Sequence, residues 1–264
     1  MILCYDDIAI TDIIGFYFFH VGYCLYGTMS EQELLKASEE GNLAQVEELL
    51  QRRISVNCRN RYDRTPLSLA SINGHFNVVQ CLIDAKAGLN TRDVFDETPL
   101  SRASLNGHLA AIGYLVEARA ALNTHDPYGR TPLFRASESG RTDVVQYLAR
   151  AKASLDTPDS DGRTPLFRAV TSGHLDVVQC LVKAGAWIYA CYNKQTPLDI
   201  PSKNHVMREA LMTSNQVWHP ATHSLAQKTT QETIHTIMRI WSCHDCSIMN
   251  LSPELLFLIF NYLF

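Results

Sequence analysis

The stretch GRTPLFRA spans Gly129–Ala136 and returns, letter for letter, 33 residues later at Gly162–Ala169. Its central tripeptide Thr-Pro-Leu belongs to a longer series that starts at Thr65, Thr98, Thr131, Thr164 and Thr196. The spacings are 33, 33, 33 and 32 residues. A fixed period of this size predicts an array of stacked supersecondary units, because one such unit cannot bury its apolar face alone.

Each Thr-Pro-Leu predicts the start of a short helix. A threonine hydroxyl can accept a hydrogen bond from a free amide there, and proline suits the first helical position because no amide donor is needed. Glycines follow at the expected helix ends, where a left-handed residue is favoured; these are Gly74, Gly107, Gly140 and Gly173. The buried face of these helices is predicted to carry Leu67, Ala70, Leu100, Ala103, Leu133, Ala136, Leu166 and Ala169.

A second helix is predicted in each unit. Its apolar residues recur at spacings of one, three and four, which places them on one helix face. They are Val78, Val79, Leu82 and Ile83, then Val144, Val145 and Leu148, then Val177, Val178, Leu181 and Val182. The segments Asp126–Gly129 and Asp159–Gly162 have the composition of tight turns. Each unit is therefore predicted to be two helices plus a loop with a turn.

The Thr-Pro-Leu series, the Gly-His pairs and the 33-residue period together resemble the ankyrin repeat. The resemblance implies an all-α solenoid of about five to six helix-turn-helix repeats over residues 30–213. Glu31–Asn57 is similar to an opening repeat, and Thr196–Thr213 to a degraded closing repeat in which Pro201 would break a helix. In the family the histidines of the Gly-His pairs stabilise turns, so His75, His108 and His174 are not expected to bind metal.

The sequence departs from the family pattern at two repeated positions. The histidine that usually follows Thr-Pro-Leu is replaced by Ser68, Ser101, Phe134, Phe167 and Asp199, so its hydrogen bonds cannot be carried over. The usual glycine after the second helix is replaced by Arg53, Lys86, Arg119 and Lys152, and returns only as Gly185. A basic side chain favours a helix C-terminus by about as much as a left-handed conformation disfavours it. We interpret these four residues as structural.

Two ladders of arginine occupy the face that the resemblance implies is concave and binds partners. Stacked arginines there would suit an acidic partner protein. The alternative is that they pair with Glu97, Asp93, Asp126, Asp143, Asp159 and Asp161 nearby. Exposed aromatic residues at the same turn tips would either anchor a partner or pack neighbouring turns. The predicted partner-binding residues are Arg61, Tyr62, Arg64, Phe95, Arg102, Leu105, Tyr128, Arg130, Arg135, Arg163 and Arg168.

The first 29 residues form an apolar extension that we expect to lie outside the fold. Ile13–Tyr26 is an apolar run of 14 residues, too short for the roughly 20 that span a membrane. A membrane-associating segment is the alternative interpretation. Ser30 and Glu33 have the spacing of a capping box, which predicts that a helix begins just after Met29.

The last part of the chain, residues 214–264, lacks the period and is predicted to be helical. Its end, over residues 250–264, resembles the opening helix of an F-box, and the whole tail is similar to those of ankyrin proteins with F-box-like or SOCS-box-like endings. The resemblance implies docking to an adaptor protein of cullin-type ubiquitin ligases through Leu251, Pro253, Leu255, Ile259, Phe260 and Leu263. The alternative is a helical cap on the end of the repeat array.

Neither composition nor motifs favour catalysis or a bound cofactor. His219, His223, Cys243 and Cys246 could supply zinc ligands, but Pro220 separates the histidines, so no metal site is predicted. No phosphate loop, nucleophile elbow or dinucleotide fingerprint occurs. The net charge of −4 gives no drive toward nucleic acid, and eight scattered cysteines suggest the cytoplasm or nucleus. The sequence thus favours a non-enzymatic interaction module, with a ligase adaptor or a membrane-tethered scaffold as alternatives.

Overall fold

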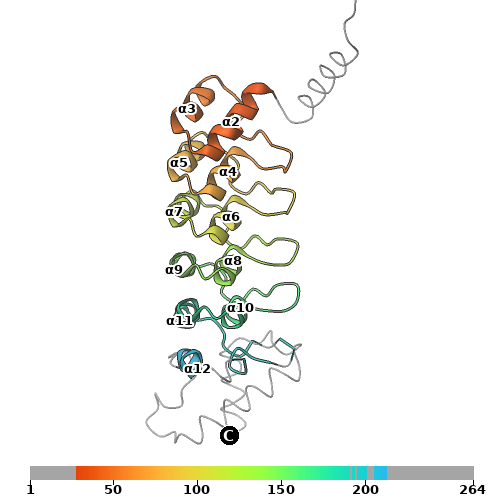
Figure 1. Ribbon diagram of the computed structural model, residues 1–264, viewed down its shortest axis with the longest axis vertical. Helices are drawn as coiled ribbons and strands as arrows, with labels where there is room; N and C mark the ends of the chain where they lie inside the picture. The colour runs from red at the N-terminus through yellow and green to blue at the C-terminus, as the bar shows by residue number, and fades with distance from the viewer. Residues whose placement is uncertain (1–27, 191, 194, 201–204, 213–264) are drawn as a thin grey trace, which may run out of the picture. The chain divides into compact units, whose positions relative to one another are not determined.

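The computed structural model describes residues 28–190, 192–193, 195–200 and 205–212 (Figure 1). Regular structure in these residues is entirely helical, apart from one isolated antiparallel bridge between Tyr192 and Gln195. They form two compact units. Unit 1 holds residues 28–103 together with His108–Ala121, and unit 2 holds Ser104–Gly107 together with the residues from Leu122 onward. Within the described residues, the predicted all-α repeat fold is confirmed.

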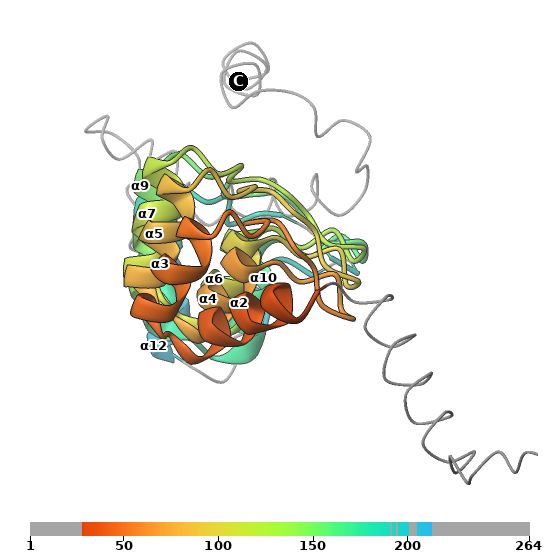
Figure 2. The same ribbon diagram turned by 90° about the horizontal axis from the view of Figure 1, so that it is seen from above.

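Unit 1 consists of helical hairpins joined by long loops. Its helices are α2 (Met29–Glu40), α3 (Leu43–Gln51), α4 (Pro66–Asn73), α5 (Phe76–Asp84), the first part of α6 (Pro99–Asn106) and α7 (Leu109–Glu117). The first helix of a hairpin packs on the first helix of the next, as α2 does on α4, and α5 packs on both α3 and α7. Figures 1 and 2 show the loops of this unit projecting to the side of the first helices.

Unit 2 repeats the same arrangement. Its helices are α8 (Pro132–Glu138), α9 (Thr142–Arg150), α10 (Pro165–Ser172), α11 (Leu175–Ala184) and α12 (His205–Met212). α8 packs on α10, α9 packs on α11, and α12 packs on α11. Residues 197–200, directly after Thr196, form turns and no α-helix, and the Thr196 N–H and hydroxyl both donate to the Asp199 carboxylate at 2.8 Å.

The local signals of the repeat act as the sequence predicts. Four threonine hydroxyls accept the amide three residues later at 3.2–3.3 Å; they belong to Thr65, Thr98, Thr131 and Thr164. Gly74 has φ 76°, and its backbone could not take a side chain, because a Cβ there would lie 2.4 Å from the His108 ring. The leucine and alanine pairs predicted to face inward are fully buried.

The predicted capping box at the start of α2 is wrong by two residues. Thr28, not Ser30, is the N-cap, and its hydroxyl accepts the Glu31 N–H at 3.3 Å. The Glu31 carboxylate accepts the Thr28 N–H at 2.7 Å in return. Both residue pairs have the required spacing, and only the helix start distinguishes them.

The basic residues after the second helices adopt the left-handed conformation considered above. Their φ angles are 61° to 69°, for Arg53, Lys86, Arg119 and Lys152. Their side chains are exposed and follow the helix C-terminus, whose partial negative charge favours a basic residue. This favourable interaction opposes the energetic cost of the left-handed conformation.

Several predictions fall outside the described residues. They concern the extension before residue 28, the zinc-type ligands His219, His223, Cys243 and Cys246, and the ligase-docking residues from Leu251 to Leu263. Within the described part of the chain, no helix combines the length and apolarity needed to cross a membrane.

Candidate functional site

The loops between the hairpins end in four tight turns, which carry most of the predicted site residues. They are Asn60–Arg64 and Asp93–Glu97 in unit 1, and Asp126–Arg130 and Asp159–Arg163 in unit 2. In each turn the first side chain accepts the N–H groups two and four residues later; Asp126, for example, accepts those of Tyr128 and Arg130 at 2.9 and 3.0 Å. Aspartate and asparagine are suited to this role because their short side chains reach their own backbone.

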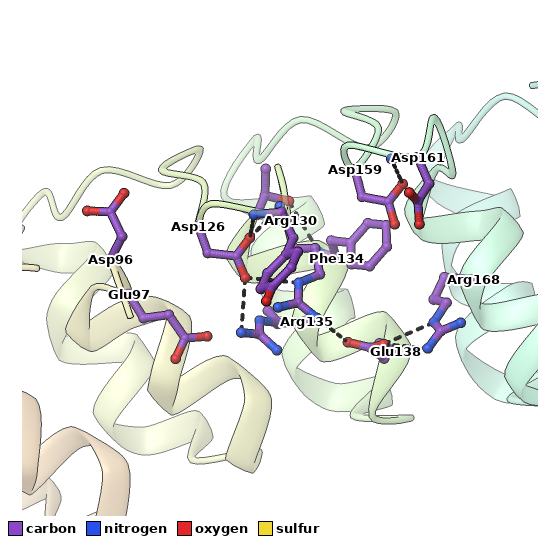
Figure 3. Close-up of polar contacts among 12 residues, drawn as sticks. Asp96, Glu97, Asp126, Arg130, Phe134, Arg135, Glu138, Asp159, Asp161 and Arg168 are labelled. Carbon is purple, nitrogen blue, oxygen red and sulfur yellow. Dashed lines mark hydrogen bonds and ion pairs between the residues drawn. The ribbon is translucent and has the colours of Figure 1, made fainter. Parts of the chain in front are cut away.

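In unit 2 a buried carboxylate also holds two arginines. The Asp126 side chain is 1% exposed, and its Oδ2 atom lies 2.9 Å from Arg130 Nε and 3.0 Å from Arg135 Nη2. Figure 3 shows Arg130 and Arg135 converging on Asp126 from the turn and from α8. A buried carboxylate that accepts this many hydrogen bonds fixes its arginines in place.

The next turn of unit 2 is connected differently. Arg163 Nε lies 2.9 Å from Asp159, and Arg163 also pairs with the exposed Asp161. Arg168 does not join them, because its Nε and Nη2 atoms bind Glu138 Oε1 at 3.0 and 2.7 Å (Figure 3). Glu138 belongs to the preceding hairpin and was not among the predicted partners of arginine.

In unit 1 two arginines converge on the second turn, Arg64 from the turn before it and Arg102 from α6 after it. Arg64 Nε lies 3.3 Å from Asp93 Oδ2, and Arg102 Nη2 lies 2.8 Å from the same atom. Arg102 Nε also lies 2.6 Å from Glu97. Burial alone would raise the pKa of Asp93, but hydrogen bonds from the Glu97 N–H, from Arg102 and from the Phe95 N–H outweigh burial and lower it.

The predicted aromatic anchors are exposed, and each stacks with arginine. Tyr62 is 38% exposed, Phe95 52% and Tyr128 61%. The guanidinium of Arg64 lies 5.3 Å from the Tyr62 ring centre, and that of Arg102 lies 5.3 Å from the Phe95 ring centre. Arg130 lies 4.5 Å from the Tyr128 ring centre. Because the arginines are fixed by carboxylates, they hold the rings at the turn tips.

The remaining predicted site residues differ in setting. Arg61 is exposed and stacks on Tyr62, with 4.8 Å between its guanidinium and the ring centre. Leu105 is half-buried, and its carbonyl accepts the Arg141 Nε–H at 3.3 Å. The pairing predicted for Asp93, Glu97, Asp126, Asp159 and Asp161 is present, which supports the interpretation of the arginines as internally neutralised. The pairing predicted for Asp143 is wrong, because Asp143 makes no ion pair with an arginine in the described part of the chain.

Two regular features join neighbouring hairpins. Histidines donate from Nε2 to a carbonyl of the preceding hairpin at 2.8–3.0 Å; they are His75, His108 and His174. A second series, not noticed in the sequence, uses Asn57, Asn90, Asn123 and Asp156, whose side chains accept a backbone N–H 31 residues later at 2.8–2.9 Å. The 33-residue spacing of these four polar residues was the available signal.

Comparison with known proteins agrees with this geometry. A family model described as Ankyrin repeats (3 copies) matches residues 34–126 and 118–196, which together exceed half of the chain. No curated protein matches the sequence.

Proposed function

Because the chain belongs to the ankyrin-repeat family, whose repeats are protein–protein interaction modules, we propose that it binds a partner protein through its loop tips and first helices. The role is non-catalytic, and it requires no cofactor. The proposed contact residues are those predicted from the sequence on the loops and on the first helices of the two units.

The observation that carries this proposal is an exposed apolar patch on the turn tips of unit 1. Tyr62, Val94 and Phe95 are all exposed, and the Val94 N–H donates to the Tyr62 carbonyl at 3.0 Å, so the two tips are adjacent. Exposed clusters of large apolar residues commonly mark interaction surfaces, and aromatic residues held rigidly contribute most to binding. The fixed stacking of Arg64 and Arg102 supplies that rigidity.

Quantitative affinity capture from cells tests the proposal. The full chain is compared with the double variant Tyr62→Ala/Phe95→Ala and with the matched control Phe76→Ala/Leu109→Ala. Phe76 and Leu109 are also exposed, but they begin the second helices α5 and α7. We expect proteins that are retained by the wild type and the control but lost at least tenfold with the tip variant, since each anchor contributes about 1–2 kcal/mol. Equal capture by all three chains would refute the proposal.

The ligase-adaptor function remains a proposal that rests on the sequence of residues 251–263 alone. A pull-down with a purified cullin-adaptor protein, with and without residues 248–264, tests it. Binding that requires those residues would establish the adaptor function, and absence of binding by the intact chain would remove it.

A further inference from the structure

A hollow of about 370 Å³ lies in unit 1 between α2, α4 and the turn Asn60–Arg64. We call it the α2–α4 hollow. Leu35 and Leu69 line it with buried side chains, whereas Lys36, Glu39 and Arg61 line it with exposed ones. It adjoins the apolar patch of the proposed binding face, because Tyr62 belongs to both.

The hollow exists because two residues of the repeat are replaced together. Leu69 occupies the position that holds Arg102, Arg135 and Arg168 in the following repeats. Arg102 spans the space from its helix to Asp93 of its own turn, at 2.8 Å. A leucine is too short to span that space, and in its turn the aspartate is replaced by Asn60. The space that the Arg102–Asp93 and Arg135–Asp126 pairs fill in the next two repeats is therefore open.

The same replacement changes the charge of the lining. Because Asn60 replaces the buried aspartate of the turn, the lining of the hollow has three basic side chains and one acidic one. The basic residues are Lys36, Arg61 and Arg64, and the acidic residue is Glu39. Arg64 is neutralised by Asp93, and Lys36 lies 3.8 Å from Glu40 with both side chains largely exposed. No carboxylate in the described part of the chain lies within ion-pair distance of Arg61. Arg61 stacks its planar face on Tyr62 and so keeps its edge N–H donors for another group.

We propose that the α2–α4 hollow binds an aspartate or glutamate side chain from an acidic segment of the partner protein, with Arg61 as the principal cation. This inference rests on the proposed function and specifies its partner. A guanidinium edge matches a carboxylate through two parallel hydrogen bonds. The single uncompensated guanidinium and the nearby Glu39 favour a singly charged carboxylate over a doubly charged phosphate.

The test is selection of random hexapeptides displayed on phage against the full-length chain. Arg61→Glu removes the proposed cation, and Arg119→Glu makes the same change of charge at another exposed arginine of unit 1. Leu69→Arg is a second variant that fills the hollow with the side chain found at this position in later repeats. We expect the wild type to select acidic peptides. Arg61→Glu and Leu69→Arg should each bind these peptides about tenfold more weakly than the wild type does. Arg119→Glu should bind them with the affinity of the wild type.

The outcomes separate this inference from the function on which it rests. Acidic peptides that bind Arg61→Glu as well as they bind the wild type would overturn the inference. Selected peptides without acidic residues that still require Tyr62 and Phe95 would also overturn it, but they would leave the proposed binding face intact. Peptides that depend on none of these three residues would count against both.

Discussion

The turn tips of the two units have the same backbone hydrogen bonds but differ in how their charged side chains pair. The turn at 126–130 of unit 2 has the sequence Asp-Pro-Tyr-Gly-Arg, and its aspartate and arginine pair within the turn at 2.9 Å. The turn at 60–64 of unit 1 has the sequence Asn-Arg-Tyr-Asp-Arg, and its arginine reaches Asp93 in the next turn. In both units a backbone hydrogen bond joins neighbouring tips, from Val94 to Tyr62 and from Ser160 to Tyr128. The arginine of the 126–130 turn thus pairs within its own turn, whereas the arginine of the 60–64 turn depends on the next turn for its counter-charge. A repeat can therefore keep its fold while the charge pairing on its surface changes.

The largest expected difference in stability concerns the residue that follows Thr-Pro-Leu. In the two repeats compared, this residue is Phe134 in unit 2 and Ser68 in unit 1. Phe134 is fully buried, and its counterpart Ser68 is buried with no hydrogen-bond partner for its hydroxyl among the described residues. Phe134→Ala should lower the free energy of unfolding by about 4 kcal/mol, because it leaves a cavity. Ser68→Ala should be neutral or stabilising by about 1 kcal/mol, since it removes an unsatisfied polar group. Urea unfolding followed by circular dichroism measures both; a clear loss of stability in Ser68→Ala would contradict this account.

The buried carboxylate of unit 2 gives the next largest contrast. Asp126→Ala should cost about 3 kcal/mol, because it leaves Arg130 and Arg135 without their buried counter-charge. Asn60→Ala removes only neutral hydrogen bonds to two backbone amides and should cost about 1–2 kcal/mol. Asp161→Ala, at an exposed ion pair, serves as the control and should change stability by less than about 0.5 kcal/mol. Equal costs for Asp126→Ala and Asn60→Ala would show that charge is unimportant in these turns.

The left-handed residue of each turn provides a smaller test. Gly129 and Gly162 have φ 75° and 89°, but only a Cβ at Gly129 would press on a neighbour, 3.0 Å from the Ser160 backbone N. Gly129→Ala should cost about 2 kcal/mol and Gly162→Ala about 1 kcal/mol, the cost of the left-handed conformation alone. Thermal unfolding compares the two. A larger loss of stability in Gly162→Ala than in Gly129→Ala would show that the close approach of neighbouring tips in unit 2 does not determine the cost of these substitutions.

The smallest expected effect on stability concerns the series Asn57, Asn90, Asn123 and Asp156, whose last member is an aspartate in unit 2. Burial raises the pKa of Asp156 above its ordinary value, while its hydrogen bond from the Trp187 N–H opposes this. A raised pKa in the folded state means that the aspartate favours folding below its unfolded pKa and loses this contribution as pH rises through the folded value. Asp156→Asn should therefore stabilise the protein by about 1 kcal/mol at pH 7 and by nothing near pH 3.

The matching change in unit 1, Asn90→Asp, should alter stability little at any pH, because residue 90 is exposed and a carboxylate there would not be desolvated. Asn90 accepts the Ala121 N–H at 2.9 Å, as Asp156 accepts that of Trp187. Unfolding midpoints measured across this pH range check both variants. A pH-independent effect of Asp156→Asn would refute the proposed role of its charge.

The sequence predicted the repeat well because its signals are local. Thr65, Pro66 and Gly74 each act on the backbone within a few residues, so spacing alone indicates where α4 begins and ends. The pairing of arginines was only partly predictable, because Arg168 binds Glu138, 30 residues earlier, rather than the aspartate of its own turn. That choice depends on side-chain reach across neighbouring hairpins, which no local pattern encodes. The α2–α4 hollow was missed for a related reason: it results from the joint replacement of two residues in one repeat.

We propose that the turn tips of unit 1 contact a partner protein. Photo-crosslinking in living cells tests it most directly, with the crosslinking amino acid p-benzoylphenylalanine placed in turn at Phe95 and, as control, at Phe76 of the second helix α5. We expect a covalent adduct with one partner protein from Phe95, the same adduct when Tyr62 is replaced instead, and no adduct with that protein from Phe76. Adducts from Phe76 alone, or the same proteins captured equally from all three positions, would contradict it.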